Sequence, residues 1–296
     1  MSANQQTESR SNSQSASINW QEIDKAKNDL KETFGMTPNF MNGFYPGAIP
    51  GAWNEAKQLR FSENTALDIK LKSLIALSVG AVIPCDYISY FEKKASNAQG
   101  TSAQEQAEAV TMAAIVRHWS VVVNGGAVDK EEFKRETDQV IKNVTKMMEE
   151  MKGKIPEQEF FLVMPLSADD AYKDMEKTLG LVPKFFQVFP KESIAAAWSE
   201  FKAFQLNPHT TLTGKQKELI GLAVASQIPC EYCTYFHRNA ASKLYGSSKE
   251  ELNEAVAMAA ITRHWSTIFN SPINDQIMFR KDADQMVQST TRSQIH

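Results

Sequence analysis

The sequence predicts an all-α protein made of two homologous helical lobes. Apolar residues recur at helical spacing along most of the 296 residues, and no convincing run alternates polar and apolar residues as a strand would. Segments of the first half also return in the second half: residues 35–40 reappear at 180–185, and residues 112–120 at 258–266. The interval is 145 residues for the first pair and 146 for the second. A period this long indicates a duplicated domain, since solenoid repeats run about 20–50 residues.

Composition and the residues that interrupt helices divide the chain into four parts. Residues 1–17 are rich in Ser, Gln and Asn and lack the apolar stretch of a signal peptide, so we expect a disordered tail. Residues 18–129 form the predicted N-terminal lobe, with a degenerate site. Residues 130–164 form a connecting helix and linker. Residues 165–296 form the predicted C-terminal lobe.

The elements of the first lobe follow from periodicity and helix-end signals. Pro84 interrupts one apolar helix, Gly100 stops the next, and Ser102 is placed to cap a long third helix. The predicted helices are, in order, 18–31, 52–59, 67–82, 85–98 and 103–123, with a charged amphipathic helix over 130–152. The second lobe repeats this order, with a helix over 213–227 that ends at a break formed by Ile228 and Pro229.

The overall composition favours an ordinary soluble protein and argues against two classes, nucleic-acid-binding proteins and membrane-spanning proteins. A formal net charge of -3 offers no basic surface for nucleic acid. No apolar stretch approaches the roughly 20 residues that span a bilayer, since the best one, 74–83, is too short. A cytoplasmic location is the default expectation. Three cysteines, an odd number, argue against a secreted disulfide framework.

One short motif concentrates reactive side chains. Cys230 and Cys233 are separated by two residues, and His237 follows four positions later. If Pro229 separates two helices, both cysteines fall in the first turn of the second helix, where free backbone N–H groups favour thiolates. Positions i and i+3 share a face, so the sulfurs can approach within bonding range, and His237 extends that face. The motif therefore supplies two thiols and a base.

Glu218 joins this motif by its position on the preceding helix. It lies about ten residues, roughly 15 Å, before the helix break, and His237 lies roughly 10 Å beyond it. Antiparallel helices would bring the two side chains to one level, where the carboxylate could orient the imidazole. The alternative is that Glu218 is a surface residue paired with a neighbouring lysine.

Comparison of the two lobes separates fold from chemistry. The first lobe replaces three of the four motif positions, with Ser73, Ile88 and Glu92, and keeps only Cys85. Cys85 is therefore interpreted as a small buried residue.

Other residues recur in both lobes, which favours a structural role for them. The sequence Arg-His-Trp occurs twice, so we interpret His118 and His264 as packing or lobe-interface residues. The four tryptophans that recur are expected in the core: Trp53, Trp119, Trp198 and Trp265.

The spacing of Glu218, Cys230, Cys233 and His237 resembles the active-site signature of the alkyl hydroperoxidase D group in the carboxymuconolactone decarboxylase family. The resemblance covers roughly residues 34–124 and 180–270. It implies the all-helical core of that family in both lobes, so that the tandem chain would form an internal pseudo-dimer.

The resemblance also implies a thiol peroxidase or disulfide oxidoreductase, a peroxiredoxin-type antioxidant activity. Cys233 would be the peroxidatic thiol, Cys230 the resolving thiol, His237 the base, and Glu218 a group acting through His237. The implied partners are a hydroperoxide or disulfide substrate and a lipoyl or thioredoxin-like reductant, with no cofactor. Family members often carry histidine directly before the second cysteine, and here that position is Tyr232.

Three other functions remain open at this point. Cys230, Cys233 and His237 could ligate zinc, although no second Cys/His pair lies close in sequence. Lactone decarboxylation would leave the cysteine pair unexplained, and a scaffold role would make it incidental. Haem attachment is excluded because Thr234, not histidine, follows Cys233. The chain is a possible homo-oligomer, with no residue that fixes the number of subunits.

Overall fold

The computed structural model describes residues 18–152, 154–272 and 274–293. Within these ranges the fold is all-helical, as predicted, and contains no strand. The predicted tail, residues 1–17, lies outside the described residues. None of the helices in the described ranges has the length and apolar character needed to cross a membrane.

The two lobes contain equivalent helices in the same order, apart from the short η2 of the first lobe, which has no counterpart in the second. The first lobe has helices α1 (Trp20–Phe34), η1 (Asn39–Gly43), η2 (Pro46–Ala48), α2 (Ile49–Leu59), α3 (Ile69–Val82), α4 (Asp86–Ala98) and α5 (Ala103–Gly125). After α6 (Lys130–Glu150) and α7 (Gln158–Phe161), the second lobe has α8 (Ala168–Leu179), α9 (Lys184–Gln187), α10 (Ile194–Phe204), α11 (Gly214–Gln227), α12 (Glu231–Lys243) and α13 (Lys249–Phe269). The last helix is α14 (Gln276–Ser293).

Local sequence signals account for the ends of the long helices. Ser102 caps α5 as predicted, through a reciprocal capping box with Glu105. Ser248 and Glu251 form the corresponding box at the start of α13. These matching caps start the two long helices at equivalent positions in the two lobes.

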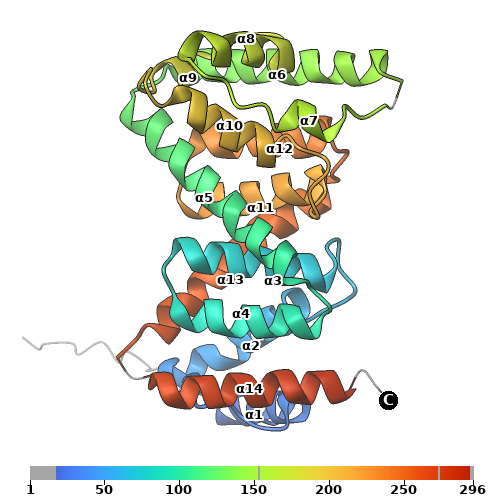
Figure 1. The fold of residues 1–296 in the computed structure, drawn as a ribbon. Coiled ribbons are helices and arrows are strands. Elements are labelled where there is room, and N and C mark those ends of the chain that lie inside the picture. The colour runs from blue at the N-terminus through green and yellow to red at the C-terminus, as the bar shows by residue number, and fades with distance from the viewer. Residues whose placement is uncertain (1–17, 153, 273, 294–296) are drawn as a thin grey trace, which may run out of the picture.

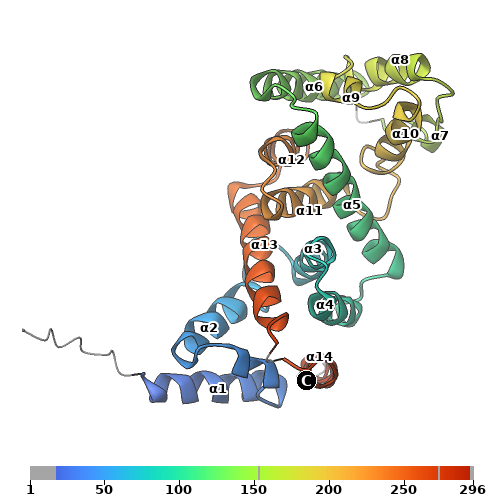
Figure 2. The same cartoon turned by 90° about the vertical axis from the view of Figure 1, so that its left-hand side faces the viewer.

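Four helices form the centre of the molecule. Helices α3 and α5 pack against each other, as do α11 and α13, and the two pairs pack together. Residues of all four contribute to one continuous apolar core. From this centre α5 runs toward α6 and α8 at one end, and α13 runs toward α14 and α1 at the other (Figures 1 and 2).

The helix that follows each long central helix crosses to the other lobe. Helix α6 packs on α8 and α12 of the second lobe, whereas α14 packs on α1 and α4 of the first lobe (Figure 2). The segment predicted as a connecting helix therefore also covers the second lobe. As a result, residues from both lobes surround the space beside α12 and the equivalent space beside α4.

The histidines that recur lie where the lobes meet, as predicted. His118 stacks on Trp119 and contacts Phe189 of the second lobe, with ring centroids 5.3 Å apart. His264 contacts Phe44 of the first lobe, with ring centroids 5.8 Å apart. The four recurring tryptophans are buried, which confirms their core assignment.

Candidate active site

The cysteine pair sits at the start of α12. Helix α11 ends at Gln227, and Cys230 is the N-cap of α12, so the helix break falls where Pro229 predicted it. The Cys233 backbone N–H donates to Cys230 Sγ over 3.3 Å. The two sulfur atoms are 2.7 Å apart, and both thiols are buried and unbridged. A disulfide, with an S–S distance of about 2.05 Å, would require only a small movement.

Glu218 and His237 meet across the antiparallel helices α11 and α12. His237 Nδ1 lies 2.6 Å from Glu218 Oε2, and Gln205 Nε2 donates to Glu218 Oε1 over 3.1 Å. Accepting at both oxygens suits an ionised carboxylate, so Nδ1 carries the shared proton and Nε2 remains for proton exchange. Only 3% of Glu218 is exposed, which rules out the alternative of a surface residue paired with lysine.

An apolar cavity of about 40 Å³ adjoins this group. Cys233 and His237 both line this second-lobe cavity, whereas Cys230 and Glu218 lie behind them. The other lining residues are almost all apolar: Ile115, Val116, Trp119, Val123, Phe133, Phe185, Phe201, Gln205 and Phe236. Four of these residues come from α5 of the first lobe, and α6 adds Phe133. Among the four predicted side chains, the sulfur that a small apolar molecule would meet belongs to Cys233.

The environment of the pair favours a thiolate on Cys230 at rest. A hydrogen bond from the Cys233 side chain lowers the pKa of Cys230 to about 6, assisted by the Cys233 backbone N–H, Asn124 and the charge of His237. Burial alone would raise it. The same hydrogen bond, together with burial and the Cys230 charge, raises the pKa of Cys233. One proton is thus shared across the 2.7 Å contact between the sulfurs.

We expect thiolate absorbance in the ultraviolet to appear as pH rises through about 6 and to disappear below it, because ionisation of Cys230 is favoured. Cys233→Ala removes the main cause, so the midpoint should move up toward the value of about 8.5 for an ordinary thiol. Cys85→Ala is the control. Burial raises the pKa of Cys85, so its loss should leave the midpoint unchanged. An unchanged midpoint of thiolate absorbance in Cys233→Ala would contradict the assignment of the lowered pKa to Cys230.

Sequence reasoning missed Gly221, which makes room for the imidazole. A Cβ at this position would lie 2.6 Å from His237 Nδ1, closer than side-chain atoms pack. The equivalent residue of the first lobe is Ala76, and the position equivalent to His237 there is Glu92. The sequence signal for this close approach was a glycine in the middle of α11, where alanine would favour the helix.

Gly221→Ala is expected to displace His237 from Glu218 and to slow disulfide formation between Cys230 and Cys233 about 100-fold, the lower range for loss of a positioned base. Gly80→Ala is the matched control, because its Cβ would crowd Ile88 at 2.5 Å in the equivalent helix α3, away from the thiols. Stopped-flow thiol oxidation and thermal unfolding would be measured for both. Equal losses of rate in the two variants would point to a general packing defect and contradict the role of Gly221.

Two further residues complete the surroundings of the pair. Asn124 Nδ2 donates to Cys230 Sγ over 3.5 Å, whereas at the equivalent place in the first lobe Cys85 Sγ donates to Asn270 Oδ1 over 3.7 Å. Tyr232, between the cysteines, donates its hydroxyl to the Val128 carbonyl over 2.6 Å. Tyr232 therefore anchors α12 to the segment before α6. In the described ranges, no three His, Cys, Asp or Glu side chains are grouped to hold a metal ion.

Comparison with known proteins agrees with this architecture. A crystal structure provisionally described as a gamma-carboxymuconolactone decarboxylase subunit from Burkholderia xenovorans LB400 matches with a TM-score of 0.53 and 15% identity. The match covers 92% of this chain and 98% of that one. At this identity the likeness shows a shared fold. No curated protein sequence matches the chain significantly.

A sequence model of the carboxymuconolactone decarboxylase family matches twice, at residues 48–130 and 192–271. Together these segments make up more than half of the chain. The chain belongs to the carboxymuconolactone decarboxylase family. The two matched segments correspond to α2–α5 and α10–α13, so the family domain occurs once in each lobe. This carboxymuconolactone decarboxylase family member keeps the cysteine pair in the second domain alone.

Proposed function

We propose that the protein is a thiol-dependent oxidoreductase that reduces organic hydroperoxides through Cys230 and Cys233. The observation that carries the proposal is the contact of the two sulfurs at 2.7 Å beside the Glu218–His237 pair. This arrangement supplies a nucleophile, a resolving thiol and a proton carrier within one buried group. Cys233 is proposed as the attacking residue because it lines the cavity.

The first step begins with transfer of the Cys233 proton to the Cys230 thiolate along their contact. The Cys233 thiolate then attacks the terminal peroxide oxygen, the O–O bond breaks, and Cys233 becomes a sulfenic acid. The alkoxide that leaves takes a proton from the imidazolium of His237. Glu218, bound at Nδ1, stabilises that imidazolium and holds the ring.

In the second step the Cys230 thiol condenses with the Cys233 sulfenic acid. A disulfide forms and water leaves, so two thiols and one hydroperoxide give a disulfide, an alcohol and water. An external dithiol then reduces the disulfide by exchange. A lipoyl group or a thioredoxin-like protein could act as this dithiol. Both kinds of reductant would be available in the cytoplasm, which is the proposed location.

The apolar wall of the second-lobe cavity supports an organic substrate over hydrogen peroxide. Trp119, Phe133 and Phe185 offer aromatic surface to an alkyl or aryl group, and Cys233 stands beside them. Lactone decarboxylation, the activity that gives the family its name, needs no pair of thiols and would leave the contact between Cys230 and Cys233 unexplained.

The proposal is tested by following cumene hydroperoxide consumption with dihydrolipoamide as reductant. We expect turnover that saturates with peroxide and is lost in Cys233→Ser. Cys85→Ser, at the equivalent of Cys230 in the first lobe, is the matched control and should keep the wild-type rate. Consumption no faster than with dihydrolipoamide alone would contradict the proposal.

A further inference from the structure

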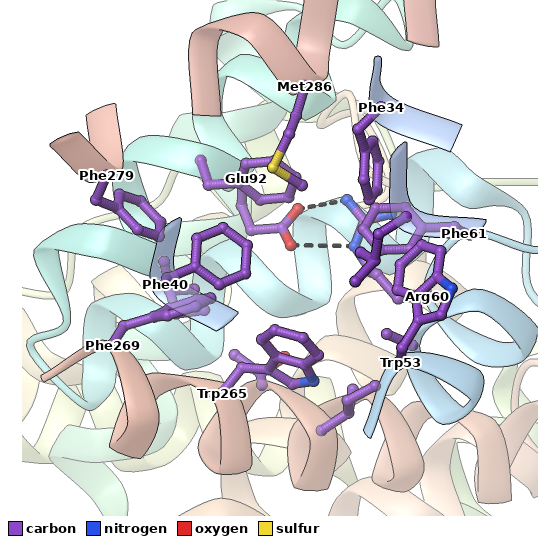
Figure 3. Close-up of a pocket in the computed structure, with 16 residues that line it drawn as sticks. Phe34, Phe40, Trp53, Arg60, Phe61, Glu92, Trp265, Phe269, Phe279 and Met286 are labelled. Atoms are coloured by element: carbon purple, nitrogen blue, oxygen red, sulfur yellow. Dashed lines mark hydrogen bonds and ion pairs between the residues drawn. The ribbon is translucent and has the colours of Figure 1, made fainter. Parts of the chain in front are cut away.

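The first lobe contains its own apolar cavity at the position equivalent to the second-lobe cavity. This first-lobe cavity lies among α1, α2, α4, α13 and α14, and aromatic side chains surround it (Figure 3). Its volume is about 60 Å³, against about 40 Å³ for the second-lobe cavity and roughly 10–15 Å³ for a single water. It is therefore the larger of the two equivalent cavities, and it holds no cysteine.

A different polar group has replaced the redox group in this lobe. Arg60 stands at the position of Gln205, and its Nε and Nη2 donate to the two oxygens of Glu92 over 3.0 and 2.5 Å. Nη2 also donates to Ser73 Oγ over 2.7 Å. All three side chains are buried. A buried ion pair needs close geometry and hydrogen-bonded partners, and Arg60, Glu92 and Ser73 provide both.

One substitution between the lobes removes an aromatic ring from the wall of the first-lobe cavity. Ala56 lines it, whereas the equivalent residue of the second lobe, Phe201, fills part of the second-lobe cavity. Phe201 stacks on Trp198 with ring centroids 5.9 Å apart. In the first lobe the equivalent tryptophan is Trp53, and the residue equivalent to Phe201 is Ala56, whose side chain is a single methyl group. The missing ring leaves space bounded by aromatic faces, which suits another aromatic ring.

One buried hydrogen-bond donor beside this space is unused. Trp265 lines the cavity, and its buried Nε1 makes no hydrogen bond in the described part of the chain. A buried donor without a partner is unfavourable, and a ligand oxygen could satisfy it. The Arg60–Glu92 pair carries no net charge, so it does not favour an anion over a neutral ligand.

We propose that the first-lobe cavity is a binding site, without redox chemistry, for a small neutral aromatic molecule that carries one acceptor oxygen. The ring would occupy the space beside Ala56, and the oxygen would accept from Trp265 Nε1. The site is independent of the chemistry at Cys230 and Cys233.

Fluorine NMR titration of the full chain with para-fluoroacetophenone tests the proposal. We expect saturable binding, with weaker binding of para-fluoroethylbenzene, which lacks the acceptor, and of para-fluorobenzoate, which is charged. Ala56→Phe introduces the ring that the second lobe already holds, and should weaken binding at least about tenfold, as filling a cavity excludes its occupant. Trp265→Phe should reduce the affinity for the ketone to that for the ethylbenzene.

Val123→Phe is the matched control, because Val123 occupies in the second-lobe cavity the place of Phe269 in the first. It should leave binding intact. Thermal unfolding and Cys230–Cys233 disulfide formation would show that Ala56→Phe is folded. Loss of binding in Val123→Phe but not in Ala56→Phe would place the ligand in the other cavity and overturn the proposal. So would the absence of saturable binding, or equal affinity for ketone and ethylbenzene.

Discussion

Cys233→Ser is expected to abolish the reaction with hydroperoxide, leaving only the uncatalysed rate. Cys233 is the cysteine that lines the second-lobe cavity, and a serine hydroxyl is not ionised to any useful extent at neutral pH. Stopped-flow measurement of peroxide consumption in a single turnover, without reductant, would show this directly. The loss should be complete although the Cys230 thiol is still present.

Cys230→Ser should give a different defect in the same experiment. Cys233 would still react once, but its sulfenic acid would have no partner, so it would be trapped by dimedone or oxidised further. If Cys230→Ser blocked the first reaction and Cys233→Ser allowed it, the roles of the two cysteines would be reversed.

Glu218→Gln is expected to lower the rate of thiol oxidation by about 10² to 10⁴, the usual range for general acid–base catalysis. The amide keeps the shape of the carboxylate but removes the charge that stabilises protonated His237 across the 2.6 Å contact. The rate of Cys230–Cys233 disulfide formation would measure this effect.

Ser73→Ala is the matched control for Glu218→Gln, because Ser73 occupies the equivalent position on α3 and contacts Arg60 instead. It should affect stability but leave the rate of disulfide formation unchanged. A Glu218→Gln rate within a factor of about two of wild type would show that the carboxylate does not act through His237.

The helical fold and the grouping of the four candidate residues could be predicted because their signals are local. The break at Pro229 fixes where α12 begins, and helical periodicity then places Cys230, Cys233 and His237 on one face. Glu218 followed from the lengths of two antiparallel helices. The duplication helped further, because residues that recur, such as His118, could be assigned to packing.

The walls of the two cavities could not be predicted, because they depend on contacts between distant segments. No local pattern indicates that α6 crosses to the second lobe and brings Phe133 beside Cys233. The close approach of Gly221 to His237 is likewise a tertiary contact. The Arg60–Glu92 pair combines residues on two helices, and neither residue marks a site by its local sequence.

Intact mass and free-thiol count, before and after a stoichiometric dose of cumene hydroperoxide, test the central claim most directly. The account predicts that the wild-type chain loses two hydrogens and two of its three thiols, with Cys85 remaining free, and that peptide mapping finds a Cys230–Cys233 disulfide. Cys233→Ser should show neither change. Retention of all three thiols in the wild-type chain, or oxygen added without a disulfide, would contradict it.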